Sequence, residues 1–235
     1  MQNHIPYVPS LYDQLSPVFG ATPSPSMELV PMVVEKTPNG ERSFDIFSRL
    51  LKDRIVMVKG EVNSVMANII KAQILYLESE DSTKPIWLYI DSPGGCVHSG
   101  LGIRDIMDLV ECPIYTLCVG MAASMGYYLL NAGDKRFITR FSQIMAHKVS
   151  AGNRGHIEDM RRSFEHSDRL NELLGNHLAE AADMPIEEYM QIVDRDLWLN
   201  AEEALVLGNR GAVDGIIQKG FRQYKDKNGI LVDIN

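Results

Sequence analysis

A serine in a glycine-flanked turn is the residue of this sequence best placed to act as a nucleophile. Ser124 lies in the segment GMAASMG, residues 120–126, between an apolar run and a stretch with helical spacing. A serine hydroxyl becomes nucleophilic when a base lies within hydrogen-bond reach and a third group orients that base. A serine that opens a helix also commonly serves as its N-cap, so the turn alone leaves both roles open.

Six histidines and several acids could complete such a set. His147 ends an expected strand, a position from which its side chain could reach the tip of a neighbouring strand, and His98 follows another glycine turn. Asp194 and Asp196 flank Arg195 ahead of an apolar segment, but acids so placed also form ordinary surface ion pairs. The other histidines lie in the N-terminal tail or on an expected exposed helix: His4, His156, His166 and His177.

Two glycine-bearing turns each follow an expected strand and open an expected helix. The first is DSPGG, residues 91–95, and the second is GMAASMG. Glycine lets the backbone approach a ligand closely, and the start of a helix presents free amide groups. Side by side on neighbouring parallel strands, the two turns could give one N–H each to an oxyanion hole.

The elements that would position these residues alternate along the chain. Runs rich in branched and aromatic residues predict strands at 54–59, 86–90, 114–119, 142–146 and 213–217. Helical spacing predicts helices near 66–77 and at 97–110, 124–130, 154–182, 185–193 and 201–207. Strand–helix repetition of this kind indicates an α/β fold. Asn228-Gly229, between two short apolar runs, favours a terminal hairpin.

The expected helix at 154–182 is long and has few apolar positions in its first half. It is either a solvated surface helix with salt bridges or an arm that contacts another subunit.

The first 26 residues hold five of the eleven prolines, one acidic residue and no Lys or Arg. They lack the features of a secretory or mitochondrial signal, which leaves a disordered tail or a removable propeptide ending near Met27.

The bulk composition narrows the class of protein. The chain has 235 residues, 45% of them hydrophobic, which suits one globular domain. A net charge of −8 disfavours nucleic acid or an anionic membrane as the main partner. No apolar run reaches the roughly 18–20 residues that would cross a bilayer. Three cysteines without metal-type spacing fit a reducing compartment.

Several segments, in order, resemble the bacterial Clp protease proteolytic subunit, the ClpP family. They are LVPMVVE (29–35), GERSFDI (40–46), SRLLKDRI (48–55), IDSPGG (90–95), GMAASMG (120–126), MAH (145–147), DRD (194–196) and AEEA (201–204). The resemblance implies a crotonase-like (ClpP) α/β fold of repeated β-β-α units with a protruding handle helix at about 154–182. It implies that the chain consists of a propeptide (1–27), a peptidase domain (28–217) and a C-terminal extension (218–235).

The resemblance also assigns roles to the candidate residues of the site. It makes Ser124 the nucleophile, His147 the general base and Asp196 the acid that orients the imidazole. The oxyanion donors that it implies are the amides of Gly94 and Met125. The expected activity is that of a serine endopeptidase that needs no metal or other cofactor.

Assembly and partners are likewise implied by the resemblance. The chain is expected to form heptameric rings, paired as a tetradecamer in the cytoplasm, with Asp194 and Arg195 at the ring contact. An AAA+ unfoldase of the ClpX, ClpA or ClpC type would dock near Trp87, Tyr89 and Leu109, use ATP and feed in unfolded polypeptides. Neither nucleic acid nor a membrane is an expected partner.

The sequence departs from the family pattern directly after the expected base. Lys148-Val149 follow His147, where most members have Gln-Pro, in a stretch expected to bind substrate and line the ring contact. Two further hypotheses therefore stand beside the active peptidase. One is a catalytically silent ring subunit, and the other is a crotonase-like enzyme that acts on acyl-CoA thioesters.

Overall fold

The computed structural model describes residues 30–38, 40–150, 152, 154–220 and 222–234. The chain divides into two compact units, Met1–Ile46 and Phe47–Asn235. In the first unit, strands β1 (Met32–Thr37) and β2 (Gly40–Asp45) pair as an antiparallel hairpin. The tail expected at residues 1–27 lies outside the described residues.

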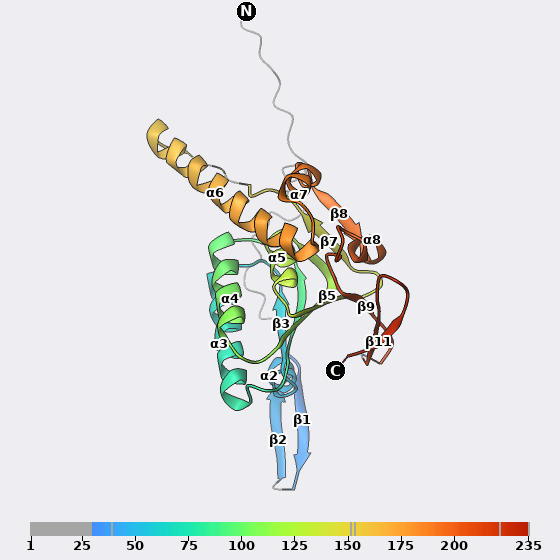
Figure 1. Ribbon diagram of the computed structural model, residues 1–235. Coiled ribbons are helices and arrows are strands. Elements are labelled where there is room, and N and C mark those ends of the chain that lie inside the picture. Colours follow the sequence, from blue (N-terminus) through green and yellow to red (C-terminus); the bar gives the residue numbers. More distant parts are fainter. Residues whose placement is uncertain (1–29, 39, 151, 153, 221, 235) are drawn as a thin grey trace, which may run out of the picture. The chain divides into compact units, whose positions relative to one another are not determined.

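The second unit is built on a nine-stranded sheet. Its strands are β3 (Ile55–Lys59), β4 (Ile86–Ser92), β5 (Ile114–Ala123), β6 (Lys135–Ile138), β7 (Gln143–Ala146), β8 (Leu197–Asn200), β9 (Gly215–Ile217), β10 (Gln223–Lys225) and β11 (Leu231–Asp233). The main path runs β11-β10-β9-β6-β5-β4-β3, while β7 pairs with β5 and β8 (Figure 1).

Helical crossovers explain why the central strands run parallel. The helices are α2 (Ile46–Lys52), α3 (Ser64–Glu80), α4 (Val97–Leu109), α5 (Met125–Asn131), α6 (Ile157–Ala182), α7 (Ile186–Ile192) and α8 (Ala201–Leu205). The chain passes from β3 to β4 through α3, from β4 to β5 through α4, and from β5 to β6 through α5. Parallel neighbours require such crossovers, and the predicted α/β alternation is confirmed.

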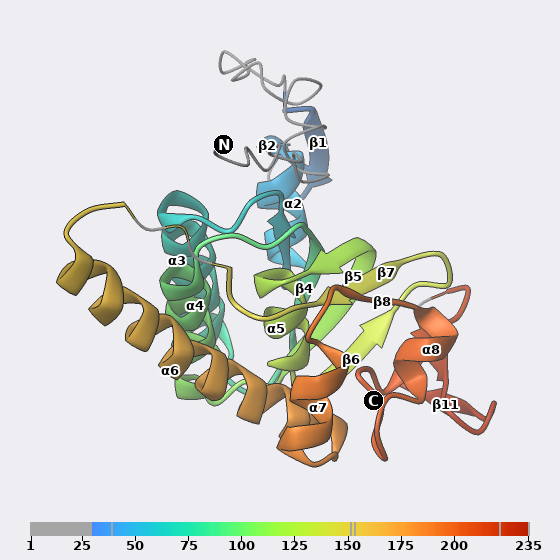
Figure 2. The same ribbon diagram turned by 90° about the horizontal axis from the view of Figure 1, so that it is seen from above.

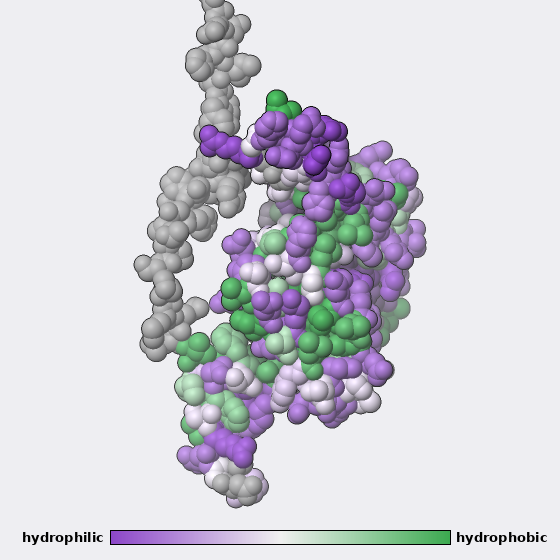
Figure 3. Space-filling view, turned by 90° about the vertical axis from the view of Figure 1, so that its left-hand side faces the viewer, coloured by the Kyte–Doolittle hydropathy of each residue, from purple (hydrophilic) through white to green (hydrophobic). Residues whose placement is uncertain are grey.

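Helix α3 illustrates how the sequence builds this layer. The Asn63 side chain caps it by accepting a hydrogen bond from the Met66 amide. Its buried face follows helical spacing: Ala67, Ile70, Ile74 and Leu77. Its outer face exposes other apolar side chains: Val65, Ile69, Leu75 and Tyr76. Figure 2 shows α3 and α4 side by side, and Figure 3 shows green, apolar surface among hydrophilic residues on the side that carries them.

Strand β5 divides its length between two neighbours, and this fork shapes one end of the sheet. Residues 115–118 pair with β6, whereas residues 121–123 pair with β7. Strand β7 in turn pairs antiparallel with β8. The carboxyl ends of β5 and β7 therefore lie side by side, and β8 begins next to the end of β7.

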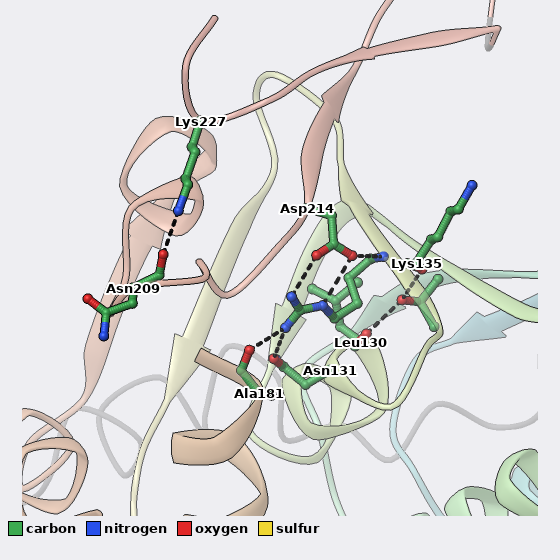
Figure 4. Close-up of polar contacts among 9 residues, drawn as sticks. Leu130, Asn131, Lys135, Ala181, Asn209, Asp214 and Lys227 are labelled. Atoms are coloured by element: carbon green, nitrogen blue, oxygen red, sulfur yellow. Dashed lines mark hydrogen bonds and ion pairs between the residues drawn. The ribbon is translucent and has the colours of Figure 1, made fainter. Parts of the chain in front are cut away.

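The long helix α6 is buried only near its C-terminal end. Its buried residues all lie in its last third: Gly175, Leu178, Ala179 and Ala182. Arg136 of β6 is 3% exposed and donates to the Ala181 carbonyl (3.0 Å), to Asn131 (3.3 Å) and to both carboxylate oxygens of Asp214 (Figure 4). This network ties the end of α6 to the sheet and leaves its first half outside the core.

The expected terminal hairpin is present and extends the sheet. Strand β10 pairs antiparallel with β9 and with β11. The Tyr224 ring lies 5.1 Å from the Phe137 ring and covers Gly215, where an added Cβ would come within 1.9 Å of the ring. Glycine is therefore required at position 215.

Among the described residues, no helix has the length and apolar content to cross a membrane.

Candidate active site

Ser124 occupies a strained junction between β5 and α5. Its φ of 53° and ψ of −119° lie in a region that residues other than glycine seldom adopt. Its amide donates to the Met145 carbonyl of β7 (2.8 Å), and its side chain makes no capping hydrogen bond to α5. The conformation thus projects the hydroxyl away from the helix, and the N-cap role is excluded.

The Ser124 hydroxyl is hydrogen-bonded to His147. The distance between Ser124 Oγ and His147 Nε2 is 2.8 Å. The fork in β5 explains this contact, because Ala123 pairs with Met145 and both strands end at the same edge of the sheet. Of the two candidate bases, His147 therefore meets the serine, whereas His98 stacks on His166 of α6.

Asp196 lies on the other side of His147, at a longer distance. Ala146 pairs with Leu197 across the antiparallel β7–β8 ladder, so the residues next to this pair are His147 and Asp196. His147 Nδ1 and Asp196 Oδ1 are 3.8 Å apart, beyond hydrogen-bond range. The Asp196 side chain is 61% exposed, against 25% for His147. The structure thus brings the three candidate residues together. The Ser124–His147 hydrogen bond is formed, whereas the His147–Asp196 hydrogen bond is not.

The DSPGG turn packs directly against the serine. A Cβ added at Gly94, whose φ is +95°, would lie 2.7 Å from the Ser124 Cβ. The Gly94 amide is already engaged, because it donates to Ser92 Oγ (3.1 Å). Gly95, and not Gly94, lines the pocket together with Ser124 and Met125, and the Gly95 amide has no hydrogen-bond partner among the described residues.

The Gly94 amide, expected to be an oxyanion donor, is thus occupied by Ser92, and the amide of this turn that lines the pocket is that of Gly95. Two consecutive glycines look alike in a sequence, and only the Ser92 contact shows which amide is already used. The Met125 amide lies in the first turn of α5, where helical amides have no partner within the helix. Both amides thus lie in the turns that the sequence singled out.

A pocket of about 70 Å³ opens beside Ser124. It is lined by Gly95, Val97, Ser124, Met125, Tyr127, Tyr128, Ala146, His147, Val149, Ser150, Leu174 and Leu178. Apolar side chains dominate its wall, and two of them, Leu174 and Leu178, come from α6. Sequence reasoning missed this contribution because it treated the long helix as a handle. The four-residue spacing of the two leucines was the available signal.

The loop after His147 is held by two side chains. Lys148 Nζ lies 2.6 Å from Asp194 Oδ1, and the Val149 amide donates to Asn171 Oδ1 of α6 (2.6 Å). The hydrogen bond and the charge of Lys148 lower the pKa of the Asp194 carboxyl below its ordinary value. Asp194, expected with Arg195 at a ring contact, is thus paired within its own chain.

The residues expected to dock an unfoldase separate into two places. Trp87 and Tyr89 lie together in an aromatic cluster that also contains Phe137 and receives Tyr224 from the terminal hairpin. Leu109 ends α4, is 74% exposed and lies outside this cluster.

The three cysteines differ in environment, and none forms a disulfide. Burial raises the pKa of the Cys112 and Cys118 thiols to about 12, whereas hydrogen bonds from Ser99 lower the pKa of the exposed Cys96 thiol. Within the described residues, no group of three or more His, Cys, Asp or Glu side chains could hold a metal ion.

A serine held at a strand–helix turn, bonded to a histidine and flanked by two amide-bearing turns is a site of the serine-hydrolase class. Comparison with protein-family models then finds a match to the Clp protease family over residues 38–220, well over half of the chain. The chain belongs to the Clp protease family, as its sequence resemblance predicted. Its mixed sheet and helices agree with the crotonase-like fold of ClpP-type proteases.

Proposed function

We propose that this chain is a serine endopeptidase in which Ser124 attacks the peptide carbonyl, His147 is the general base and Asp196 orients the imidazole. The observation that carries the proposal is the 2.8 Å hydrogen bond between Ser124 and His147. The strained backbone at Ser124 supports it, because such strain is typical of residues held for chemistry.

In the proposed reaction, His147 Nε2 accepts the hydroxyl proton as Ser124 Oγ bonds to the carbonyl carbon, and later gives it to the leaving amine. The amides of Gly95 and Met125 stabilise the oxyanion, a contribution of about 3–4 kcal/mol for one donor in other serine proteases. Asp196 must approach by about 1 Å to hydrogen-bond His147, and catalytic hydrogen bonds often tighten when substrate binds.

The pocket beside Ser124 supports a preference for an apolar residue next to the cleaved bond. Its walls include Val97, Leu174 and Leu178, and no acidic or basic side chain except His147 lines it. An apolar side chain gains free energy by leaving water for such a wall. We propose unfolded polypeptides as substrates, because the chain must be extended for its side chains to reach the pocket one at a time.

We propose that the active form is a double heptameric ring in the cytoplasm, fed by an AAA+ unfoldase that hydrolyses ATP. The chain itself would need no cofactor, and residues 1–27 would be a propeptide. The exposed apolar face of α3 supports contact between subunits, since one chain leaves it uncovered. The exposed first half of α6 supports a second contact, between rings.

The two other hypotheses have less support. A silent subunit would have no use for a closed Ser124–His147 hydrogen bond. An acyl-CoA enzyme could use the same amides but would not need a serine and a histidine in this arrangement. The active peptidase accounts for both features.

The test is hydrolysis of short fluorogenic peptides by the assembled protein without ATP. Wild-type protein should cleave peptides with Leu or Met before the scissile bond, and the Ser124→Ala variant should not. A folded substrate should persist until an unfoldase and ATP are added. Degradation of a folded substrate by the peptidase alone, or equal turnover by Ser124→Ala, would contradict the proposal.

A further inference from the structure

The residues that follow His147 line more than one hollow. Val149 and Ser150 line the pocket that contains Ser124. Lys148 does not line that pocket. It lines a separate hollow with the turn at residues 193–196 and shares a small cavity with Val149 and α6. A change at Lys148 therefore alters the side of the loop that faces Asp196 and leaves the substrate pocket wall in place.

The turn that carries Asp196 has few other ties to the site. Asp196 is 61% exposed, and its carboxylate stands 3.8 Å from His147. Within the described residues, the Lys148–Asp194 bond is the only hydrogen bond between this turn and residues 147–150. The carboxylate of Asp194, two residues before Asp196, is thus held at 2.6 Å by the residue that directly follows His147.

We propose that Lys148 is a positioning residue whose ion pair with Asp194 holds the turn so that the Asp196 carboxylate can close on His147. This inference rests on the proposed peptidase function. Lys148, which replaces the usual Gln of the family, then has a role within one subunit. Its cation links the loop after His147 to the turn that carries Asp196.

A small displacement would suffice for an effect on rate. The Asp196 carboxylate needs to move about 1 Å to reach hydrogen-bond distance. A misplacement of about 1 Å in a catalytic arrangement can cost about 100-fold in rate. Because the pair is exposed, it should control the rate far more than the stability of the fold.

The test compares kcat and KM of the assembled wild type with those of Lys148→Met and Asp194→Asn, using one fluorogenic peptide. Each substitution should lower kcat about tenfold and leave KM within about twofold, because the pocket wall is unchanged. Combining the two should cost no more than either alone, as expected for partners in one interaction. A matched control is Lys84→Met, which removes an equally short lysine–aspartate pair, 2.6 Å to Asp81, and should leave kcat unchanged.

Rescue separates positioning from a general loss of structure. Lys148→Arg should retain most of the wild-type kcat, and exchange of the charges by Lys148→Asp with Asp194→Lys should restore at least half of it. Native mass spectrometry should find the wild-type subunit number in each variant.

Two outcomes would overturn the inference. One is a wild-type kcat in Lys148→Met, and the other is loss of assembly in that variant, which would assign Lys148 to a subunit contact. Either result is distinguishable from failure of the peptidase proposal, in which the wild type and Ser124→Ala would be equally inactive.

Discussion

The two halves of the candidate triad are built in different ways. Ser124 and His147 are joined at 2.8 Å at the ends of two paired strands, next to the buried core. Asp196 stands 3.8 Å from the same imidazole, on an exposed turn. The sheet itself sets the nucleophile and base, whereas the acid lies where β8 begins, and we propose that a surface ion pair positions it. The difference implies that the acid-bearing half is the one that can be adjusted from outside the core.

Removal of each half in turn should have the largest effects on activity. Ser124→Ala should lower peptide turnover by about 10⁶-fold, and Asp196→Asn by about 10⁴-fold, the sizes found for such residues in other serine proteases. Initial rates with a fluorogenic peptide measure both. Equal losses in the two variants would show that the halves contribute alike, against the difference drawn above.

Cysteine alkylation compares the exposed Cys96 with the buried Cys112 and Cys118. Cys118 lies on β5, with Cys112 just before it, and burial raises both pKa values to about 12. Hydrogen bonds lower the pKa of the Cys96 thiol, next to Gly95. Because the thiolate is the reactive form, Cys96 should react with iodoacetamide at pH 8 more than about 1,000-fold faster than the others.

Peptide mass mapping over time follows each cysteine separately, and denatured protein provides the control in which all three react alike. Raising the pH from 8 to 10 should speed the Cys112 and Cys118 reactions more than that of Cys96, whose thiolate fraction is already higher. Reaction of Cys118 at a rate near that of Cys96 would show that β5 opens readily, contrary to the burial of Cys118.

A buried and an exposed ion pair should differ in how much each contributes to the free energy of unfolding. Asp214→Asn leaves the Arg136 cation, 3% exposed, without its charged partner, and should reduce the free energy of unfolding by about 3 kcal/mol. Lys148→Met removes an exposed pair and should cost less than about 1 kcal/mol. Urea unfolding at fixed protein concentration, followed by tryptophan fluorescence, compares the two. A larger loss in Lys148→Met than in Asp214→Asn would reverse the assignment of structural and positioning roles.

Much of the central sheet could be predicted from local pattern. The strands expected at 54–59, 86–90 and 114–119 correspond to β3, β4 and the first part of β5. The extension of β5 to Ala123 was not predicted, because it depends on pairing with β7, far along the chain. Strands β6 and β8 were also missed, whereas the equally short β7 was predicted at 142–146. Strands of four residues carry too little periodicity to be found consistently.

The candidate site divides along similar lines. Ser124, His147 and Asp196 could be named from motifs in the sequence, and the structure brings them together. The resemblance named Gly94 as an oxyanion donor, whereas the hydrogen bond that occupies the Gly94 amide favours Gly95, and a sequence does not display that bond. The Lys148–Asp194 pair joins residues 46 positions apart across a β7–β8 register that the sequence does not display.

Labelling by a fluorophosphonate tests whether Ser124 is an activated nucleophile. The reagent is added to the assembled wild type, to Ser124→Ala and to His147→Ala, and labelled peptides are located by mass spectrometry. We predict one label per chain on Ser124 in the wild type and none in either variant. An assembled wild type that remains unlabelled, or carries the label on another serine, would contradict the account.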